Sequence, residues 1–227
     1  MDNTLIKPDI ITNVNQKRVR EIRFLTESTF VLRFDRDNME FNAGQHVIVG
    51  TKGSLNQREY SIYSSEKQNF LEILVREVLD GNVSAQLRKV RPGDLLEVNG
   101  PFGSFRMEPR ELYSRKYMFI ASGTGISPFH SFVTSYPGIT YKILHGIRNI
   151  EEAYERNEYD PKRYIPCVSH GKRNKFNGRV TDFLPDYPDE PDMDYYICGN
   201  SNMIFDVNKM LKNKGVTSGR IFIEVYF

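Results

Sequence analysis

Cysteine and tryptophan are scarce in this sequence. Its 227 residues include no tryptophan and only two cysteines, Cys167 and Cys198. Two thiols are too few for a disulfide framework, a four-cysteine zinc site or an iron–sulfur cluster held by this sequence alone. Because disulfide-rich domains belong to oxidising compartments, the cysteine count favours a reducing compartment, and we expect a cytoplasmic protein.

Charge of one sign and long apolar runs are lacking too. The 31 Lys and Arg residues nearly balance the 29 Asp and Glu residues, so neither half of the chain has the basic excess of a nucleic-acid-binding protein. No segment approaches the ~18 consecutive apolar residues of a membrane-spanning helix, and the first ten residues lack the apolar stretch of a signal peptide. We therefore expect no nucleic-acid partner, no membrane insertion, and a monomer.

Aromatic residues other than tryptophan are plentiful. Hydrophobic residues make up 39% of the sequence, with 15 Phe and 13 Tyr among them. This content is enough to bury a sizeable core and excludes wholesale disorder. The length allows one large domain or two compact ones.

The first hundred residues predict short strands separated by turns. Phe30, Leu32 and Phe34 alternate with Val31 and Arg33, which is the period of two of a β-strand. Several strands at such spacing predict a small closed barrel or a sandwich. Further strands are expected at residues 19–25, 46–49, 60–63, 71–78 and 95–98, with a short helix at residues 84–90.

The pattern changes after Gly103. Apolar runs then alternate with loops and possible helices, which predicts a parallel, doubly wound sheet. The expected fold has two domains: an antiparallel β-barrel at residues 1–108 and an α/β domain at residues 109–227. The strands of the second domain are expected at residues 117–121, 141–144, 164–168, 195–198 and 223–227.

A first candidate site is the segment Arg58-Glu59-Tyr60-Ser61 on a predicted barrel strand. An arginine side chain can hold a phosphate through its planar set of donors. Tyr60 lies two positions on, hence on the same face, where its ring could stack on a flat heterocycle. Ser61 could donate a hydrogen bond to a ring nitrogen. On these four residues alone, an ordinary surface strand is the better interpretation.

A second candidate is the turn Gly81-Asn82-Val83-Ser84 before the short predicted helix. Free backbone N–H groups at the start of a helix suit a pyrophosphate. Alternatively, Ser84 or Asn82 simply caps the helix, which this turn alone favours.

A third candidate is the Gly123-Thr124-Gly125 turn, which follows a buried strand and opens a helix. Pro128 fits the first turn of that helix, where its missing N–H is harmless. Glycines let a phosphate approach the backbone closely, although the spacing does not match the G-x-G-x-x-G fingerprint. Dinucleotide binding and plain helix packing are equally supported at this point.

Two further segments attract attention near the end of the sequence. Cys198-Gly199-Asn200 ends a predicted buried strand, at the edge where open α/β sheets bind ligands. A free cysteine there also fits a small buried residue of the core. The aromatic end at residues 223–227 indicates that this strand packs on another part of the protein.

Six short motifs occur in order: R-E-Y-S, G-N-V-S, G-P-F-G, G-T-G-I-S-P-F, C-G-N and E-V-Y-F. In this combination the sequence, from about residue 40 to its end, resembles the ferredoxin/flavodoxin–NADP(+) reductase superfamily, most of all its compact bacterial members. The resemblance implies a barrel that binds a flavin and an α/β domain that binds the nicotinamide dinucleotide. It favours FAD over FMN on family likeness alone.

The resemblance also implies roles for individual residues. Arg58 would hold a flavin phosphate, Tyr60 would stack on the isoalloxazine, and the turn at residues 81–84 would take the flavin pyrophosphate. Tyr226 or Phe227 would cover the flavin face that the nicotinamide must reach. The catalytic set is Ser61, Cys198, Glu224 and Tyr226. The cofactor-binding set is Arg58, Glu59, Tyr60, Ser61, Arg76, Gly81, Asn82, Val83, Ser84, Gly123, Thr124, Gly125, Arg148, Ser169, Lys172, Arg173, Arg179, Cys198, Gly199, Tyr226 and Phe227.

The choice between NADP and NAD depends on groups that could bind a 2′-phosphate. Similar bacterial reductases use arginines in the region of Arg148 and of the basic segment that includes Lys172, Arg173 and Arg179. His170 departs from the pattern, because relatives often carry arginine there. An acidic residue at the strand end would instead indicate NAD. We expect NADP as the cofactor.

The function implied is hydride transfer between NADP(H) and FAD, and single-electron transfer between the flavin and a separate ferredoxin or flavodoxin. The flow of electrons can run in either direction. Two alternatives stay open: an NADH-dependent reductase component that feeds an oxygenase or a cytochrome, and a flavin-binding electron-transfer subunit without its own nicotinamide turnover.

Overall fold

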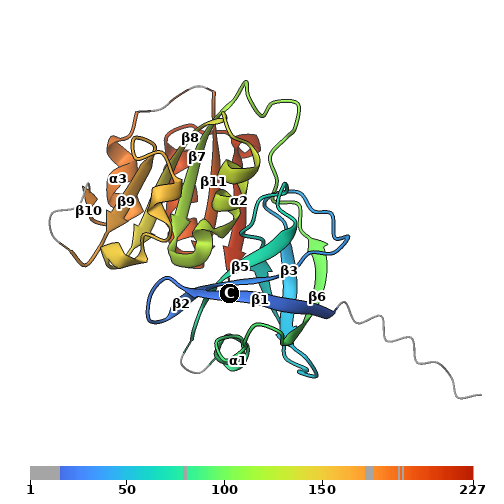
Figure 1. Cartoon of the computed structure of the whole chain (residues 1–227). Coiled ribbons are helices and arrows are strands. Elements are labelled where there is room, and N and C mark those ends of the chain that lie inside the picture. Colours follow the sequence, from blue (N-terminus) through green and yellow to red (C-terminus); the bar gives the residue numbers. More distant parts are fainter. Residues whose placement is uncertain (1–15, 79–80, 172–175, 189, 191, 227) are drawn as a thin grey trace, which may run out of the picture.

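The computed structural model describes all residues except 1–15, 79–80, 172–175, 189, 191 and 227. Figure 1 shows two domains side by side, with the last strand of the chain running from the α/β domain towards the barrel. The expected two-domain class, an antiparallel barrel followed by a parallel doubly wound sheet, is confirmed.

The first domain is a six-stranded antiparallel barrel. Its strand order is β4-β3-β6-β1-β2-β5, and β4 meets β5 through a bridge between Ile62 and Ile73 and a 2.7 Å hydrogen bond from Tyr63 N to Glu72 O. This closure decides between the barrel and the sandwich. The strands are β1 (Gln16–Phe24), β2 (Thr29–Asp35), β3 (His46–Thr51), β4 (Arg58–Ser61), β5 (Phe70–Arg76) and β6 (Leu95–Phe102).

The predicted alternation along β2 places side chains in a hydrophobic core on each face of the strand. Phe30, Leu32 and Phe34 point into the barrel core, whereas Val31 packs into a separate core shared with the second domain. The short helix α1 (Asn82–Leu87) covers one end of the barrel, where Val83 is buried. It begins and ends two to three residues earlier than the sequence indicates.

The second domain is a six-stranded parallel sheet with helices on both faces. The chain enters at β7 in the middle, builds outward to β10, and then returns to add β11 and β12 on the other side. The strands are β7 (Lys116–Ser122), β8 (Thr140–Ile147), β9 (Tyr164–Val168), β10 (Phe176–Asn177), β11 (Met193–Asn200) and β12 (Ile221–Tyr226). The helices are α2 (Ser127–Ser135), α3 (Val180–Phe183) and α4 (Ser201–Asn213).

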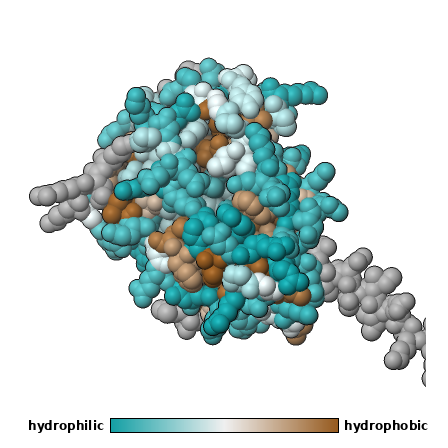
Figure 2. Space-filling model, in the orientation of Figure 1, coloured by the Kyte–Doolittle hydropathy of each residue, from teal (hydrophilic) through white to brown (hydrophobic). Residues whose placement is uncertain are grey.

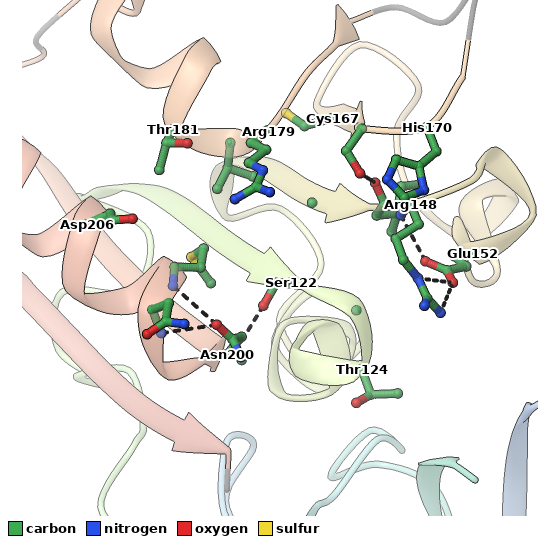
Figure 3. A pocket seen from close by; sticks show the side chains of 18 of the residues that line it. Ser122, Thr124, Arg148, Glu152, Cys167, His170, Arg179, Thr181, Asn200 and Asp206 are labelled. Atoms are coloured by element: carbon green, nitrogen blue, oxygen red, sulfur yellow. Dashed lines mark hydrogen bonds and ion pairs between the residues drawn. The ribbon is translucent and has the colours of Figure 1, made fainter. Parts of the chain in front are cut away.

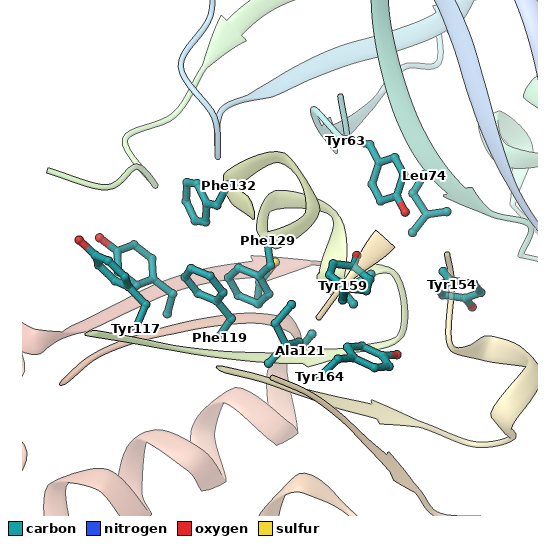
Figure 4. Close-up of a cluster of buried hydrophobic side chains, with 14 of the residues drawn as sticks. Tyr63, Leu74, Tyr117, Phe119, Ala121, Phe129, Phe132, Tyr154, Tyr159 and Tyr164 are labelled. Atoms are coloured by element: carbon teal, nitrogen blue, oxygen red, sulfur yellow. The ribbon is translucent and has the colours of Figure 1, made fainter. Parts of the chain in front are cut away.

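One hydrophobic core joins the two domains (Figure 4). Tyr63 and Leu74 reach it from the barrel, and Phe119 of β7 meets Phe129 and Phe132 of α2 there. The Phe119 and Phe129 rings stack with their centroids 4.9 Å apart. Because apolar burial is the main favourable term in folding, this shared core fixes how the domains sit against each other.

Polar contacts reinforce the same interface. Tyr63 donates from its hydroxyl to Glu155 at 2.7 Å, and the Arg23 guanidinium of the barrel pairs with the other oxygen of Glu155 at 2.6 Å. His130 of α2 stacks on the Tyr63 ring at 3.8 Å and bonds the Tyr63 carbonyl at 2.7 Å. Glu155 adopts a left-handed φ of 45°, which is unusual for a residue other than glycine. Several charged groups therefore hold this loop of the second domain against the barrel.

The face of the molecule in Figure 2 is mostly hydrophilic, and hydrophobic side chains are visible only in small separate patches. None of the helices that the structure describes is both long and apolar enough to cross a membrane.

Gly44 provides a test of the domain interface. Its φ is +90°, and a Cβ there would lie 1.9 Å from the Phe105 carbonyl oxygen and 2.8 Å from ring carbons of Phe132. We expect Gly44→Ala to lower the free energy of unfolding by about 2–4 kcal/mol, because it adds backbone strain to overpacking.

Gly53 is the matched control, because it has a φ of +77° and no atom within 4 Å of a Cβ. Gly53→Ala carries the strain alone and is expected to cost about 1 kcal/mol. The measurement is urea unfolding of both variants and the wild type. Equal losses for the two variants would contradict the packing argument.

Candidate active site

A cavity of about 720 Å³ opens at the carboxyl ends of the parallel strands (Figure 3). Ser122 at the end of β7 and Asn200 at the end of β11 line it, and these two strands flank the point where the strand order reverses. Ligands of open α/β sheets bind at such a switch point. Of the residues proposed for cofactor binding, those that line the cavity are Arg76, Gly123, Thr124, Arg148, Ser169, Arg179 and Gly199.

The glycines near the cavity allow β11 to approach both β7 and the turn at residues 123–126 closely. A Cβ on Gly125 would lie 2.4 Å from the Cys198 carbonyl oxygen, and one on Gly199 would lie 2.4 Å from the Ser122 hydroxyl. The Asn200 N–H donates to that hydroxyl at 2.9 Å. Gly125 and Gly199 thus have a packing reason of their own, and Gly123, with a φ of +53° and no atom within 4 Å of a Cβ, faces open space.

Two cysteines lie beside the cavity without being exposed. Cys167 of β9 lines the cavity but is buried, and burial raises the pKa of its thiol to about 12. Cys198 is fully buried beneath the glycine turn. It lies opposite Glu224 in the register of the neighbouring strands β11 and β12.

The basic side of the cavity contains an acidic residue that the sequence analysis missed. Glu152 accepts from the Arg148 guanidinium at 2.9 Å and from the Arg148 backbone N–H at 2.9 Å. Arg76, which comes from the barrel, lies 4.0 Å from the same carboxylate. Figure 3 shows Arg148 and Glu152 together at one end of the cavity and Asp206 at the other. No local pattern marks this pair in the sequence, because Arg148 follows β8 and Glu152 ends a short 3₁₀ helix (Ile150–Glu152).

The remaining predicted residues divide between described and undescribed parts of the chain. Lys172, Arg173 and Phe227 lie outside the described residues. Tyr226 ends β12 beside Asn200 of β11, and its side chain also lies outside the description.

A second cluster forms where the barrel meets β12. Ser61 donates from its hydroxyl to Glu224 at 3.0 Å, and His46 Nδ1 lies 3.7 Å from the other Glu224 oxygen. Burial raises the pKa of Glu224 to about 7; the Ser61 hydrogen bond opposes this shift and the Glu59 charge adds to it. Three of the four residues proposed as catalytic, Ser61, Cys198 and Glu224, are therefore neighbours. His46 was not among the predicted residues.

Burial increases along β4 instead of alternating, because Arg58 and Glu59 are both exposed. Arg58 is exposed, Tyr60 packs partly against the barrel core, and Ser61 is buried. Burial raises the pKa of Tyr60 to about 12. The Arg58 guanidinium donates to the neighbouring Gln57 carbonyl at 2.9 Å.

The alternative that Asn82 or Ser84 caps helix α1 with its side chain is wrong. Gly81 is the N-cap, and neither Asn82 nor Ser84 caps the helix with its side chain. The Ser84 hydroxyl instead accepts a hydrogen bond from the Val78 N–H at 3.1 Å, which ties the turn to the chain after β5.

Known proteins resemble both domains. Residues 16–107 match the model of an oxidoreductase FAD-binding domain, and residues 119–209 match that of an oxidoreductase NAD-binding domain. The fold, the cavity and these matches define a flavin-binding and nicotinamide-nucleotide-binding oxidoreductase of two domains. The chain belongs to the ferredoxin–NADP reductase-like superfamily.

Individual relatives point to more than one activity. The electron transfer component of toluate 1,2-dioxygenase from Pseudomonas putida is 25% identical over 93% of this chain and 67% of its own length. The ferredoxin–NADP reductase of Azotobacter vinelandii is 27% identical over 91% of this chain and 92% of its own. The crystal structure of an Amycolatopsis cytochrome P450 reductase superimposes with a TM-score of 0.83, at 25% identity, over 92% of this chain and 68% of that protein. This chain covers only 59% and 61% of the length of two other curated relatives, so it matches only part of each of them.

Glu224 provides a test by pH. Its carboxyl has a pKa of about 7 in the folded protein against an ordinary 4.5, so the folded state favours the protonated form. Stability from this group is complete below about pH 4.5 and is lost as pH rises through about 7. We expect Glu224→Gln, neutral at every pH, to raise the free energy of unfolding at pH 8 by about 1–3 kcal/mol and to change it little at pH 5.

The measurement is chemical unfolding at both pH values, with flavin content matched between proteins. Glu40→Gln serves as the control, because Glu40 is exposed. A gain at pH 8 that is no larger than at pH 5 would contradict the argument.

Proposed function

We propose that this protein transfers hydride between NADP(H) and FAD, and passes single electrons between the flavin and a separate ferredoxin or flavodoxin. The observation that carries the proposal is the Ser61–Glu224 hydrogen bond, because it joins the FAD-binding domain to the last strand of the nucleotide-binding domain. The Azotobacter reductase, matched over 92% of its length, supports this partner class. We propose the domain boundary at residues 108 and 109, in the connection between β6 and β7.

The barrel has groups that suit FAD. Arg58 would bind a phosphate, Tyr60 would stack on the isoalloxazine, and the turn at residues 81–84 would face the pyrophosphate. Exposed Arg58 and half-buried Tyr60 are two positions apart on β4, the spacing at which side chains of a strand share a face. A bound flavin supplies the ability to take two electrons as hydride and to pass them on one at a time.

The α/β domain has groups that suit the nicotinamide dinucleotide. The turn Gly123-Thr124-Gly125 would face the pyrophosphate, and Arg148 and Arg179 would face the adenosine end, with Ser169 beside them. Lys172 and Arg173 are proposed for the same end. A cavity of about 720 Å³ falls in the range of cofactor pockets, about 300–1,000 Å³.

Ser61 and Glu224, where the barrel meets β12, form a polar cluster in which the Glu224 carboxyl can hold a proton. Ser61 donates to Glu224, so this carboxylate oxygen is held at one position. Because the pKa of Glu224 is about 7, the carboxyl can bind or release a proton near neutral pH. We propose Ser61, Cys198, Glu224 and Tyr226 as the residues around the reacting rings, with Tyr226 or Phe227 as the gate to the flavin.

A second candidate is an NADH-dependent reductase component for an oxygenase or a cytochrome. The observation that favours it is Glu152, since a carboxylate at this position can accept from free ribose hydroxyls and holds Arg148 in an ion pair. The relatives from Pseudomonas and Amycolatopsis are named as the electron transfer component of a dioxygenase and as a cytochrome P450 reductase. A flavin-binding subunit without nicotinamide turnover is the remaining alternative.

Anaerobic reduction separates these functions. Purified protein with bound flavin is titrated with NADPH and, in parallel, with NADH, while the flavin absorbance is recorded. The proposal expects bleaching near one equivalent of NADPH and a preference for it of ~10-fold or more in kcat/KM, because one 2′-phosphate ion pair contributes about 1.5–3 kcal/mol. A preference for NADH supports the second candidate, and no bleaching with either supports the third.

Tyr60 tests the flavin site. We expect Tyr60→Ala to weaken FAD binding by roughly 5- to 100-fold, since stacking of a base on an aromatic ring contributes about 1–3 kcal/mol. Tyr60→Phe keeps the ring and should retain FAD. The measurement is the FAD content after dialysis and the Kd from fluorescence titration. Equal retention by the Ala variant would exclude stacking on Tyr60.

A further inference from the structure

His145 is a fully buried histidine whose contacts the proposed function has not used. It lies on β8 beside Ala121 of β7 and is 0% exposed. One ring nitrogen, Nε2, lies 2.8 Å from the carbonyl oxygen of Gly123, and the other, Nδ1, lies 2.7 Å from the hydroxyl of Tyr164 on β9. The ring therefore joins the glycine turn at the cavity to a neighbouring strand.

These partners leave one arrangement of protons. A carbonyl oxygen can only accept, so Nε2 carries the hydrogen and donates it to Gly123. Burial lowers the pKa of His145 to about 4, which makes the ring neutral at physiological pH and leaves Nδ1 as an acceptor. Tyr164 is buried too, and burial raises the pKa of its hydroxyl, so the hydroxyl keeps its proton and donates it to Nδ1. The chain of donors runs from Tyr164 through His145 to Gly123.

The bond to Gly123 also determines where the next backbone N–H points. In a trans peptide the carbonyl and the following N–H point in opposite directions. With the Gly123 carbonyl turned inward to buried His145, the Thr124 N–H is turned away from the core. Thr124 lines the cavity, in the first turn of a 3₁₀ helix (Gly123–Ile126), where N–H groups have no partner within the helix.

A glycine at this position gives such an anchor a physical role. Gly123 has a φ of +53° and no atom within 4 Å of the position that a Cβ would take. Glycine adopts positive and negative φ almost equally well. The hydrogen bond from His145 is a side-chain contact that selects one orientation of the Gly123–Thr124 peptide.

We propose that His145, oriented by Tyr164, is a positioning residue that turns the Thr124 N–H towards the cavity to bind the pyrophosphate of the nicotinamide dinucleotide. This inference rests on the proposed function, because it assumes that the dinucleotide occupies this cavity. His145 acts through the backbone and does not touch the ligand itself. The two buried aromatic residues His145 and Tyr164 thus orient a backbone donor for an anion, and neither of them carries a charge.

The test compares four variants by calorimetric titration with NADP⁺ and NAD⁺. His145→Phe keeps an aromatic ring and loses the donor, and we expect it to weaken binding of the preferred nucleotide ~10-fold. His145→Gln can still donate an amide hydrogen and should bind within ~3-fold of the wild type. Tyr164→Phe loses the group that orients His145 and should bind ~3-fold more weakly.

The matched control is Tyr154→Phe. Tyr154 is a buried tyrosine whose ring centroid lies 5.9 Å from that of His145, but its hydroxyl bonds Thr29 of the barrel at 3.2 Å. Loss of this hydroxyl should leave nucleotide binding unchanged.

A second readout separates positioning from general damage. Adenosine 2′-monophosphate, or adenosine if NAD⁺ is preferred, lacks the pyrophosphate and should bind His145→Phe as well as the wild type. Equal loss for the fragment and the whole nucleotide, or no loss for either, would overturn the proposal. If His145→Phe does not fold, Tyr164→Phe decides, and binding equal to that of Tyr154→Phe overturns the proposal. Failure of the wild type to bind either nucleotide would refute the proposed function instead.

Discussion

The hydrophobic core between the barrel and the sheet is the constraint on which the other features depend. Val31 and Tyr63 enter it from the barrel and Phe132 enters it from α2, so one buried cluster belongs to both domains. Gly44 brings the barrel backbone against Phe132 at a distance that no side chain allows. Because interiors are close-packed, the relative position of the domains has little freedom. The contact between Ser61 and Glu224 requires this fixed position, since these residues lie 163 positions apart in the sequence.

Local patterns in the sequence predicted most of the fold. The alternation at residues 30–34, the turns between strands and the later change to strand–helix units identified both domains and their order. Closure of the barrel depends on a bridge between Ile62 and Ile73 and could not be read from local pattern, which left the sandwich open. The two-residue strand β10 escaped prediction because, among the strands that the structure describes, it pairs with β9 alone. The observed ends of strands and helices differ from the predicted ends by a few residues, because tertiary contacts decide where an element stops.

The candidate site was partly predictable in the same sense. The glycine turn, Arg148 and Ser169 line the cavity and follow predicted strands, so their position at one edge followed from the topology. Glu152 and His145 were missed for a different reason. Each takes its role from a partner in space, Arg148 and Gly123 respectively, and neither belongs to a motif. The structure also gives Gly125 and Gly199 a packing role, and for Gly125 this is the alternative that the sequence had left open.

Burial of Cys167 has a chemical consequence for a protein that handles electrons. Oxidants and alkylating reagents attack the thiolate, and a thiol whose pKa is about 12 supplies very little of it at neutral pH. The side chain borders the cavity yet is fully shielded by its neighbours. Peroxide formed when a reduced flavin meets oxygen would thus find very little thiolate at Cys167, so formation of a sulfenic acid at this position is disfavoured.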